Sequence, residues 1–359
     1  MQLRTPRWRA SPPLRGAIAG DGIFTPEGTP GDPSTRRRDI ERRAGVPGRR
    51  CAPPVRVTEY SPQGGTPPGK PSCQAAASDW PLPCQFVVRD GITQSGALVR
   101  ADQPWGDAQL AELYDAFVFD GDLPLYLELA REQGSCVLEV ACGSGRVLVP
   151  LARAGFDVVG IDVSPYMLAL AQAKLSTSLR ARLVQADMRD FRLGQSDFDL
   201  AIVAVKSFAY LTEPNDQLSC LQQIHTHLRS GGLLAIDFMH PLPEWVATAP
   251  GAMRDDLLQR VPDRGFTLSR VESVVSTDLA GQVRIIRSAY EIIDDHGAVV
   301  AKRFVEWPYR WTYRFEAEHL LARAGFTVEA VYGGYQREPF TSSSTAMVFL
   351  ARKPRIGSA

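Results

Sequence analysis

The stretch Val137-Leu138-Glu139-Val140-Ala141-Cys142-Gly143-Ser144-Gly145-Arg146-Val147-Leu148 decides the fold class. An apolar, β-branched run enters a turn with two glycines, and a helical pattern begins near Val147. Glycine supplies positive φ angles and lets a backbone approach a ligand closely. The helix that follows exposes N–H donors in its first turn. The stretch therefore predicts a buried strand, a ligand-binding loop and a helix in direct succession.

A second strand, ending at Asp162, strengthens this interpretation. Asp162 comes nineteen residues after Gly143, and a carboxylate at the tip of the second strand can accept the hydroxyl protons of an adenosine ribose. Helix capping is the competing role for Asp162. We assign that role to Ser164, which directly precedes Pro165, because serine before a proline is a typical helix start.

The chain from about Asp107 onward alternates short strands with helical patterns, which predicts an α/β fold with a mostly parallel sheet. Asp107 stands at the expected N-cap of the first helix. Gly231-Gly232 is interpreted as the turn into the fifth strand. The expected helices are Ala108–Phe119, Leu123–Gln133, Pro150–Ala154, Met167–Leu175 and Gln217–Leu228, and the expected strands are Cys136–Ala141, Asp157–Ile161, Ala181–Gln185, Asp199–Val205 and Leu233–Phe238.

An insert, Pro241 to Arg310, follows the fifth strand. Three of its segments alternate as antiparallel strands, namely Ser269–Thr277, Gln282–Ile293 and Ala298–Trp307. An aromatic cluster stands where the insert ends; we expect at least two of its members simply to pack the insert on the sheet. The cluster comprises Trp307, Tyr309, Trp311 and Tyr313.

The bulk composition is that of a globular protein, with 44% hydrophobic and 22% charged residues. Lys+Arg and Asp+Glu are both 40, which argues against a nucleic-acid binder that works by bulk charge. The six cysteines form no CxxC pair and no Cys/His cluster with zinc spacing, so no metal is expected. No apolar run approaches the roughly 18 to 20 residues of a membrane helix. We expect a soluble, cytoplasmic protein.

Residues 1–100 differ from the rest. Residues 1–60 hold twelve Arg and six acids, and residues 1–83 hold fifteen of the 27 prolines. Such a segment cannot offset the entropy of ordering itself, so we expect a disordered Pro/Arg-rich extension before a domain at 101–354. Three functional interpretations stay open: a transit peptide, a nucleic-acid-binding arm around Arg36-Arg37-Arg38, and an extension that a downstream non-AUG start would leave untranslated.

The motif of the glycine loop differs from the fingerprint of dinucleotide-binding sites. That fingerprint requires a third glycine, and its place is taken by Leu148. The Glu139-x-Ala-Cys-Gly-Ser-Gly pattern instead resembles motif I of the class I S-adenosylmethionine-dependent methyltransferases, and Gly160–Leu168 resembles their second motif. Further resemblances follow in order as far as Pro354: Gln185–Phe191, the strand Phe198–Val205, Leu228–Asp237, Leu320–Phe326, and a last hairpin of Thr327–Val331 with Thr345–Ala351.

The resemblance implies a Rossmann-like sheet of seven strands, mostly parallel, with a C-terminal antiparallel hairpin and the antiparallel β insert 241–310 as a lid over the acceptor. It implies S-adenosyl-L-methionine as cofactor. Glu139, Ala141, Gly143 and Gly145 would line its methionine part and Asp162 would hold the ribose. The other implied contacts are Val163 and Met167 near the adenosine, Asp187 and Met188 at the adenine, Val205 near the sulfonium, and Tyr114 over the methionine carboxylate. Tyr114 could equally be an ordinary helix residue.

A dedicated catalytic residue is not required, because methyl transfer needs mostly alignment and a base only when the acceptor arrives protonated. Of the five histidines only His240 follows a core strand, so it is the catalytic candidate. Lys206 departs from the small or amide residue common at its position in similar enzymes. The leading hypothesis is methyl transfer to N or O of a small molecule. The alternatives are methylation of protein or RNA, a silent S-adenosylmethionine-binding scaffold and, disfavoured by Leu148, a nicotinamide-dependent oxidoreductase.

Overall fold

A computed structural model describes residues 107–117, 119–261 and 264–355. The expected disordered extension, residues 1–100, lies outside the described residues, as does the expected domain start at 101. No helix among the described residues is long and apolar enough to cross a membrane.

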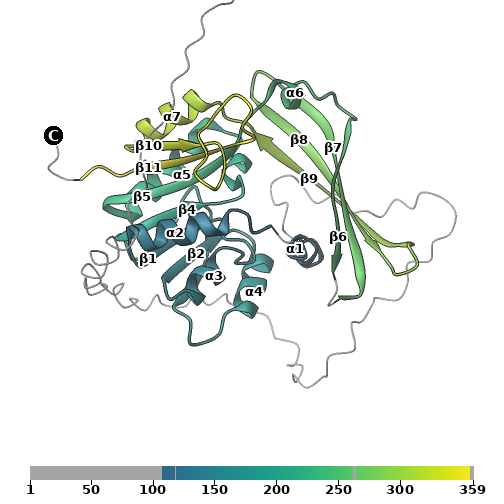
Figure 1. The fold of residues 1–359 in the computed structure, drawn as a ribbon, viewed down its shortest axis with the longest axis horizontal. Coiled ribbons are helices and arrows are strands. Elements are labelled where there is room, and N and C mark those ends of the chain that lie inside the picture. The colour runs from purple at the N-terminus through teal and green to yellow at the C-terminus, as the bar shows by residue number, and fades with distance from the viewer. Residues whose placement is uncertain (1–106, 118, 262–263, 356–359) are drawn as a thin grey trace, which may run out of the picture. The chain divides into compact units, whose positions relative to one another are not determined.

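The central sheet has seven strands in the order β10-β11-β5-β4-β1-β2-β3 (Figure 1). Strands β1 to β5 run parallel, while β11 is antiparallel to both β5 and β10. The predicted Rossmann-like sheet with its C-terminal hairpin is therefore confirmed. The strands are β1 (Cys136–Val140), β2 (Asp157–Asp162), β3 (Ala181–Gln185), β4 (Phe198–Val203), β5 (Leu228–Met239), β10 (Thr327–Tyr332) and β11 (Ala346–Arg352).

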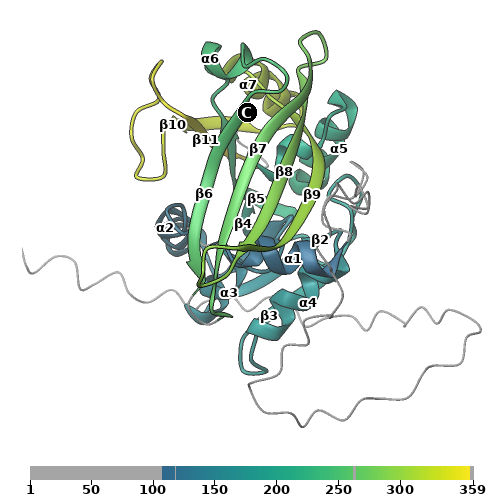
Figure 2. The same ribbon diagram turned by 90° about the vertical axis from the view of Figure 1, so that its right-hand side faces the viewer.

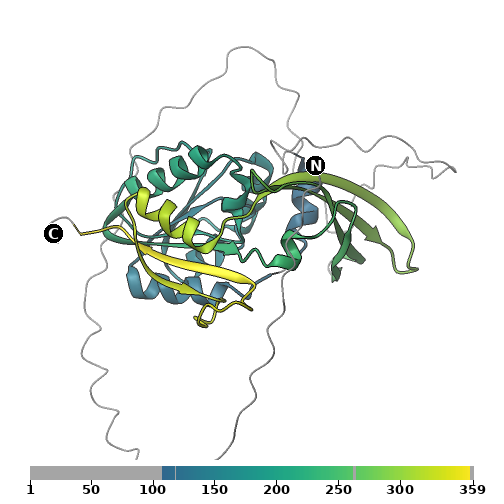
Figure 3. The same ribbon diagram turned by 90° about the horizontal axis from the view of Figure 1, so that it is seen from above.

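Helices cover both faces of this sheet, as Figure 3 shows from above. On one face α2 (Leu123–Gln133) and α3 (Leu148–Arg153) bury their apolar sides, and on the other α5 (Pro214–His227) and α7 (Arg314–Arg323) do so. All five residues of β1 are buried, as expected for a parallel strand covered on both faces. Helix α4 (Pro165–Lys174) is capped by Ser164, whose Oγ accepts the N–H of Met167 at 3.3 Å, as predicted.

The order of the strands fixes where a ligand can bind. Strand β1 pairs with β2 on one side and with β4 on the other, so the chain reverses its progress across the sheet there. In open α/β sheets ligands bind at such a switch point, outside the carboxyl ends of the strands. The glycine loop, Asp162 and the turn after β4 all lie at this edge.

The insert forms a separate antiparallel sheet in the order β6-β7-β8-β9, led by the short helix α6 (Pro243–Val246) (Figure 2). The sequence predicted three of these strands and missed β6 (Met253–Val261), an edge strand in which two acids precede two leucines without alternation. Strand β7 also begins earlier than expected. The other strands are β7 (Phe266–Asp278), β8 (Val283–Ile293) and β9 (Val299–Arg310).

Two local expectations need correction. Gly231 and Gly232 lie inside β5, at an irregularity of its pairing with β4, and do not form a turn before it. Helix α1 (Ala108–Asp115) is shorter than expected, although Asp107 caps it as predicted by accepting the N–H groups of Gln109 and Leu110. Leu110 and Leu113 of α1 pack on the antiparallel sheet.

Candidate functional site

The glycine loop after β1 combines a packed side with an open side. Ala141, Gly143 and Gly145 have φ angles of 58°, 53° and 81°, a region that L side chains rarely adopt. A Cβ on Gly145 would lie 3.0 Å from Val149 Cγ2 and 3.1 Å from Ala171 Cβ, so this glycine packs the loop on α3 and α4. A Cβ on Gly143 would meet no atom within 4 Å. The backbone at Gly143 is therefore accessible to a ligand.

Asp162, at the end of β2 as predicted, is hydrogen-bonded to this loop. Its Oδ2 accepts the N–H of Gly143 at 2.8 Å, and its Oδ1 accepts the N–H of Ser164 at 2.9 Å. Burial raises the pKa of Asp162, while these backbone hydrogen bonds lower it. Three backbone N–H groups, those of Gly143, Val163 and Ser164, act on this carboxylate, which offers about four acceptor positions. Asp162 can therefore fix the loop and still accept a hydroxyl group of a ligand.

Glu139, within β1, carries an unsatisfied polar atom. The residue is 3% exposed, and its buried Oε2 has no hydrogen-bond partner among the described residues. Burial raises the pKa of Glu139 to about 8, partly opposed by the nearby Arg146. A buried oxygen without a partner costs free energy. A cationic or hydrogen-bond-donating ligand group would remove that cost.

The raised pKa of Glu139 predicts a pH-dependent stability. The folded-state pKa of about 8 exceeds the ordinary value of 4.5. The contribution of protonated Glu139 to the free energy of unfolding is therefore complete below pH 4.5 and is lost as the pH rises through 8. We expect Glu139→Gln to flatten the decline in unfolding free energy between pH 5 and 8 by up to about 5 kcal/mol. Urea unfolding at several pH values measures this. Glu128→Gln, at an exposed position, is the control. Equal slopes of unfolding free energy against pH for the wild type and Glu139→Gln would show that Glu139 does not titrate between pH 5 and 8.

The segment before α2 is tied to the glycine loop by charged side chains. Arg146 pairs with Asp122 through Nη1–Oδ1 at 2.5 Å and Nη2–Oδ2 at 2.7 Å, and Asp122 is fully buried. Arg146 also donates to the carbonyl of Phe119 at 2.8 Å. Asp115 of α1 accepts hydrogen bonds from Ser144 and from Lys174 of α4. Sequence reasoning missed these pairs.

Tyr114, also on α1, is half-buried, and burial raises its pKa. The charges that act on this pKa belong to Arg146, Arg270, Asp162 and Asp122. Charged groups of both the glycine loop and the antiparallel sheet therefore act on Tyr114, and its contact with the methionine carboxylate stays a prediction.

The residues expected at the adenosine differ in exposure. Val163 is 50% exposed and available to a ligand, whereas Met167 is 1% exposed. Asp187 accepts a hydrogen bond from Arg189 Nη2 at 2.6 Å, and this lowers the pKa of Asp187. Met188 packs partly buried against the core. The four contacts to the cofactor stay predictions.

The turn after β4 is strained and bound to β5. Val205 and Lys206 have φ angles of 54° and 60°, unusual for non-glycine residues and most of all for a β-branched one. Asp237 of β5 holds this turn, because its Oδ1 accepts the N–H of Lys206 at 2.9 Å. Lys206 Nζ lies 4.0 Å from Asp237 Oδ2. The unexpected lysine is therefore compensated by a fully buried carboxylate.

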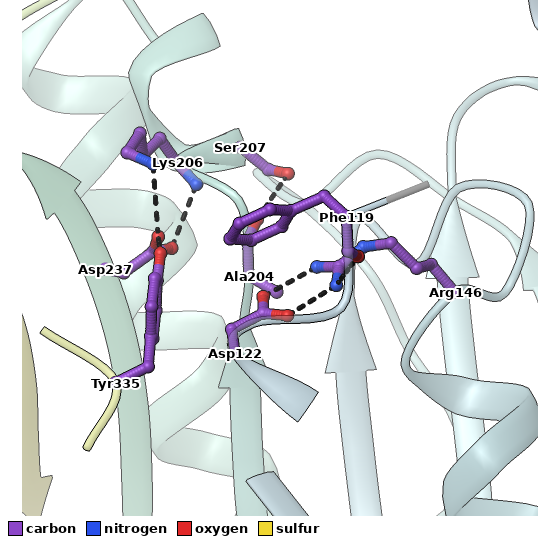
Figure 4. A network of polar contacts seen from close by, with 8 residues as sticks. All are labelled: Phe119, Asp122, Arg146, Ala204, Lys206, Ser207, Asp237 and Tyr335. Carbon is purple, nitrogen blue, oxygen red and sulfur yellow. Dashed lines mark hydrogen bonds and ion pairs between the residues drawn. The ribbon is translucent and has the colours of Figure 1, made fainter. Parts of the chain in front are cut away.

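A tyrosine from the loop between β10 and β11, Tyr335, also contacts Asp237. Tyr335 donates a hydrogen bond to Asp237 Oδ2, and its ring lies 6.1 Å from that of Phe119. Figure 4 shows the group of Lys206, Asp237 and Tyr335 beside that of Arg146 and Asp122, with Phe119 between them. The C-terminal hairpin thus contributes to the same edge of the sheet as the glycine loop.

His240 packs toward the loop between β10 and β11. Its Nδ1 lies 2.7 Å from the carbonyl oxygen of Ser344, and its ring contacts Phe340 edge-on at 4.9 Å. Both partners belong to that loop, and sequence reasoning anticipated neither. A catalytic role for His240 stays a prediction.

The aromatic cluster packs the antiparallel sheet on the edge of the central sheet. Tyr309 and Trp311 are buried with Ala209 of the short helix η2 (Ser207–Tyr210), whereas Tyr313 is 47% exposed. Trp307 faces Tyr210 with ring centroids 5.7 Å apart. Its Nε1 donates to Ser288 Oγ at 3.0 Å, which in turn lies 3.2 Å from a carboxylate oxygen of Glu272. A polar chain therefore runs along the inner face of this sheet.

Buried carboxyl groups outnumber the cations at the carboxyl ends of the strands. Four carboxylates, those of Asp122, Glu139, Asp162 and Asp237, are buried at this edge, while two cations, Arg146 and Lys206, lie among them. Like charges that share a buried site favour binding of an opposite charge. The site suits a ligand that carries positive charge, such as a sulfonium. No group of three or more His, Cys, Asp or Glu that could hold a metal ion occurs in the described part of the chain.

Known proteins resemble this chain in sequence and fold. A family model of the methyltransferase domain matches residues 137–232. YqeM of Bacillus subtilis (strain 168), named as a methyltransferase, is 33% identical over 112 residues, which are 31% of this chain and 45% of that protein. The chain thus matches less than half of that relative's length.

Matches to Streptomyces venezuelae, one in sequence and one in structure, extend over a longer range. A dTDP-3-amino-3,4,6-trideoxy-alpha-D-glucopyranose N,N-dimethyltransferase is 26% identical over 235 residues, which are 62% of this chain and 92% of that enzyme. The crystal structure of DesVI matches with a TM-score of 0.56 and 25% identity, and the match covers 68% of this chain and 98% of the DesVI chain. The family model includes the glycine loop and ends before the antiparallel sheet.

Proposed function

Because the chain belongs to the class I S-adenosylmethionine-dependent methyltransferases, we propose that it methylates a nitrogen of a small molecule that carries an amine. Nitrogen and oxygen acceptors both suit displacement at a sulfonium. The nitrogen is favoured by one observation: even with Glu139 protonated, the buried carboxylates of Asp122, Asp162 and Asp237 outnumber the cations Arg146 and Lys206 at the strand ends. An amine arrives as a cation and is attracted there, whereas a neutral hydroxyl is not. The amino-sugar dimethyltransferase among the relatives acts on such an amine.

The residues at the glycine loop fit the cofactor. The unpartnered Oε2 of Glu139, the open space at Gly143 and the exposed side chain of Val163 are features that a bound nucleoside with a charged amino-acid tail would use. S-adenosylmethionine supplies a methyl group on a sulfonium that leaves as a neutral thioether. In this assignment Asp162 holds the ribose, and Glu139 with the loop backbone holds the methionine part.

The contribution of the protein to the reaction is alignment and exclusion of water. The pair Arg146–Asp122 fixes the segment before α2 over the strand ends, and the contact between Trp307 and Tyr210 sets the antiparallel sheet against the turn after β4. Rigid placement of two reactants removes most of the entropic barrier of a bimolecular step. We assign the antiparallel sheet to cover the acceptor, with the polar inner chain of Glu272 and Ser288 available to orient it.

An acceptor assay tests this proposal. The full chain is incubated with S-[methyl-³H]adenosylmethionine and dTDP-3-amino-3,6-dideoxy-α-D-glucopyranose, glycine or a peptide with a free N-terminus. The matched control replaces the sugar amine by a hydroxyl. We expect transfer to one of these amines, at least about tenfold faster than to the hydroxyl control, a difference of about 1.4 kcal/mol in the barrier. Faster labelling of the hydroxyl control, of bulk RNA or of folded protein would contradict the proposal.

A further inference from the structure

Asp237 is a buried carboxylate with two hydrogen-bond donors and a lysine beside it. It is 0% exposed. Its Oδ1 accepts the N–H of Lys206 at 2.9 Å, its Oδ2 accepts the hydroxyl of Tyr335, and Lys206 Nζ lies 4.0 Å from Oδ2 (Figure 4). Three chain segments far apart in sequence, β5, the turn after β4 and the loop between β10 and β11, therefore meet at one carboxyl group.

A purely structural role does not require a charge at this place. An asparagine could accept the N–H of Lys206 through its oxygen and still hydrogen-bond to Tyr335 through its amide nitrogen. A carboxylate makes the same contacts but must lose its hydration to be buried, which is costly. The ammonium of Lys206 lies beyond hydrogen-bond distance and compensates that charge only in part. What a carboxylate can do and an amide cannot is take up a proton.

Tyr335 connects this carboxylate to more accessible space. Its side chain is half-buried, in contrast to the fully buried Asp237. The hydroxyl donates its proton to Asp237, so the lone pairs of its oxygen can accept a second hydrogen bond. The ring lies against Phe119, which is 44% exposed and stacks under the guanidinium of Arg146 at the glycine loop. Tyr335 thus lies on the side of Asp237 that faces the glycine loop.

We propose that Tyr335 and Asp237 form a proton relay that deprotonates the acceptor ammonium before methyl transfer. This inference rests on the proposed function, in that it requires an amine acceptor. The ammonium gives one proton to Tyr335 Oη while the hydroxyl proton of Tyr335 moves to Asp237 Oδ2. The acceptor becomes a neutral amine with a free lone pair, Tyr335 remains a neutral phenol and Asp237 becomes a neutral acid. The proton leaves to solvent by the reverse route after the methylated product has dissociated.

The surroundings of Asp237 suit a proton acceptor. Burial raises the pKa of Asp237, Asp122 raises it further, and Lys206 and Tyr335 lower it. A carboxyl group whose pKa is raised toward neutrality takes a proton more readily. The titratable and charged groups that face the pair are Lys206 after β4, Tyr335 before β11, Asp122 before α2, Tyr126 of α2, Tyr309 of β9 and, toward Tyr335, Arg146 of the glycine loop.

Tyr335→Phe and Asp237→Asn test the relay. The first keeps the ring and removes the hydroxyl, and the second keeps an acceptor for Lys206 N–H. Tyr332→Phe, which removes a hydroxyl three residues away at the end of β10, is the matched control. The probe is dTDP-3-amino-3,6-dideoxy-α-D-glucopyranose, or the amine that the wild type methylates fastest. Rates are measured from pH 6 to 10, and affinity for S-adenosylhomocysteine is measured for each variant.

We expect kcat of both variants to fall about 10²- to 10⁴-fold at pH 7, the usual range for loss of a general base. Affinity for S-adenosylhomocysteine should stay within about twofold of the wild type. The lost rate should return tenfold per pH unit until the acceptor amine is itself deprotonated, because hydroxide then replaces the relay. Tyr332→Phe should behave as the wild type.

A loss of the same size at every pH, or a Tyr335→Phe variant as fast as the wild type, would overturn the relay while leaving amine methylation intact. Failure of the proposed function has a different signature, in which the wild type itself transfers no methyl to any amine of the panel but does so to a hydroxyl or a polymer.

Discussion

Replacing Arg146 by methionine should lower the free energy of unfolding by about 3–5 kcal/mol. The guanidinium makes two hydrogen bonds to Asp122, a carboxylate that is 0% exposed. Removing one partner of a buried pair strands the other charge in a medium that solvates it poorly. Methionine keeps the aliphatic packing of the arginine, so the loss reports the charge. Urea unfolding monitored by circular dichroism measures it.

Arg180→Met is the matched control for this prediction. Arg180 also pairs with an aspartate, Asp157, but its side chain is 56% exposed, so the loss should stay below about 1 kcal/mol. The double variant Asp122→Asn with Arg146→Met removes both charges and should recover part of the stability. An Arg146→Met protein within about 1 kcal/mol of the wild type would show that the pair does not hold the segment before α2.

The local part of the site could be predicted from the sequence. The glycine loop, Asp162 and the cap at Ser164 depend on residues close together in the chain, where strand, turn and helix follow in order. Their chemistry is set by backbone geometry and by the ends of neighbouring parallel strands. For the same reason the five parallel strands were predictable, since each carries its own apolar pattern, whereas the seven-stranded sheet with its C-terminal hairpin was implied by the family resemblance.

The contacts of the site between residues far apart in the chain could not be predicted. Tyr335 and Asp237 are 98 residues apart and Asp122 and Arg146 are 24 apart, and no periodicity relates such positions. Asp237 stands in an otherwise apolar strand, so the pattern indicated a core position and gave no reason to ask what compensates its charge. The edge strand β6 was missed because a register shift between Asp255 and Leu257 interrupts the alternation of its residues.

Replacing Gly143 by alanine should weaken binding of S-adenosylhomocysteine roughly 5- to 150-fold, about 1–3 kcal/mol. The added methyl group would meet no protein atom within 4 Å, so the fold has space for it. Its cost to stability is the left-handed backbone, about 1–2 kcal/mol. The added methyl group would displace a ligand that lies against the loop backbone.

Gly194→Ala separates the two effects. Gly194 has a φ angle of 66° and no atom within 4 Å of an added Cβ, but it lies between β3 and β4, away from the glycine loop in the chain. This variant should lose about as much stability as Gly143→Ala and bind S-adenosylhomocysteine as the wild type does.

Calorimetric titration of the full chain with S-adenosylhomocysteine, repeated on Gly143→Ala and Gly194→Ala, tests the assignment of the cofactor to the glycine loop most directly. We expect one site per chain in the wild type and in Gly194→Ala, weaker binding only in Gly143→Ala, and no heat on titration with NAD. Equal affinity in all three proteins, or binding of NAD without binding of S-adenosylhomocysteine, would contradict it.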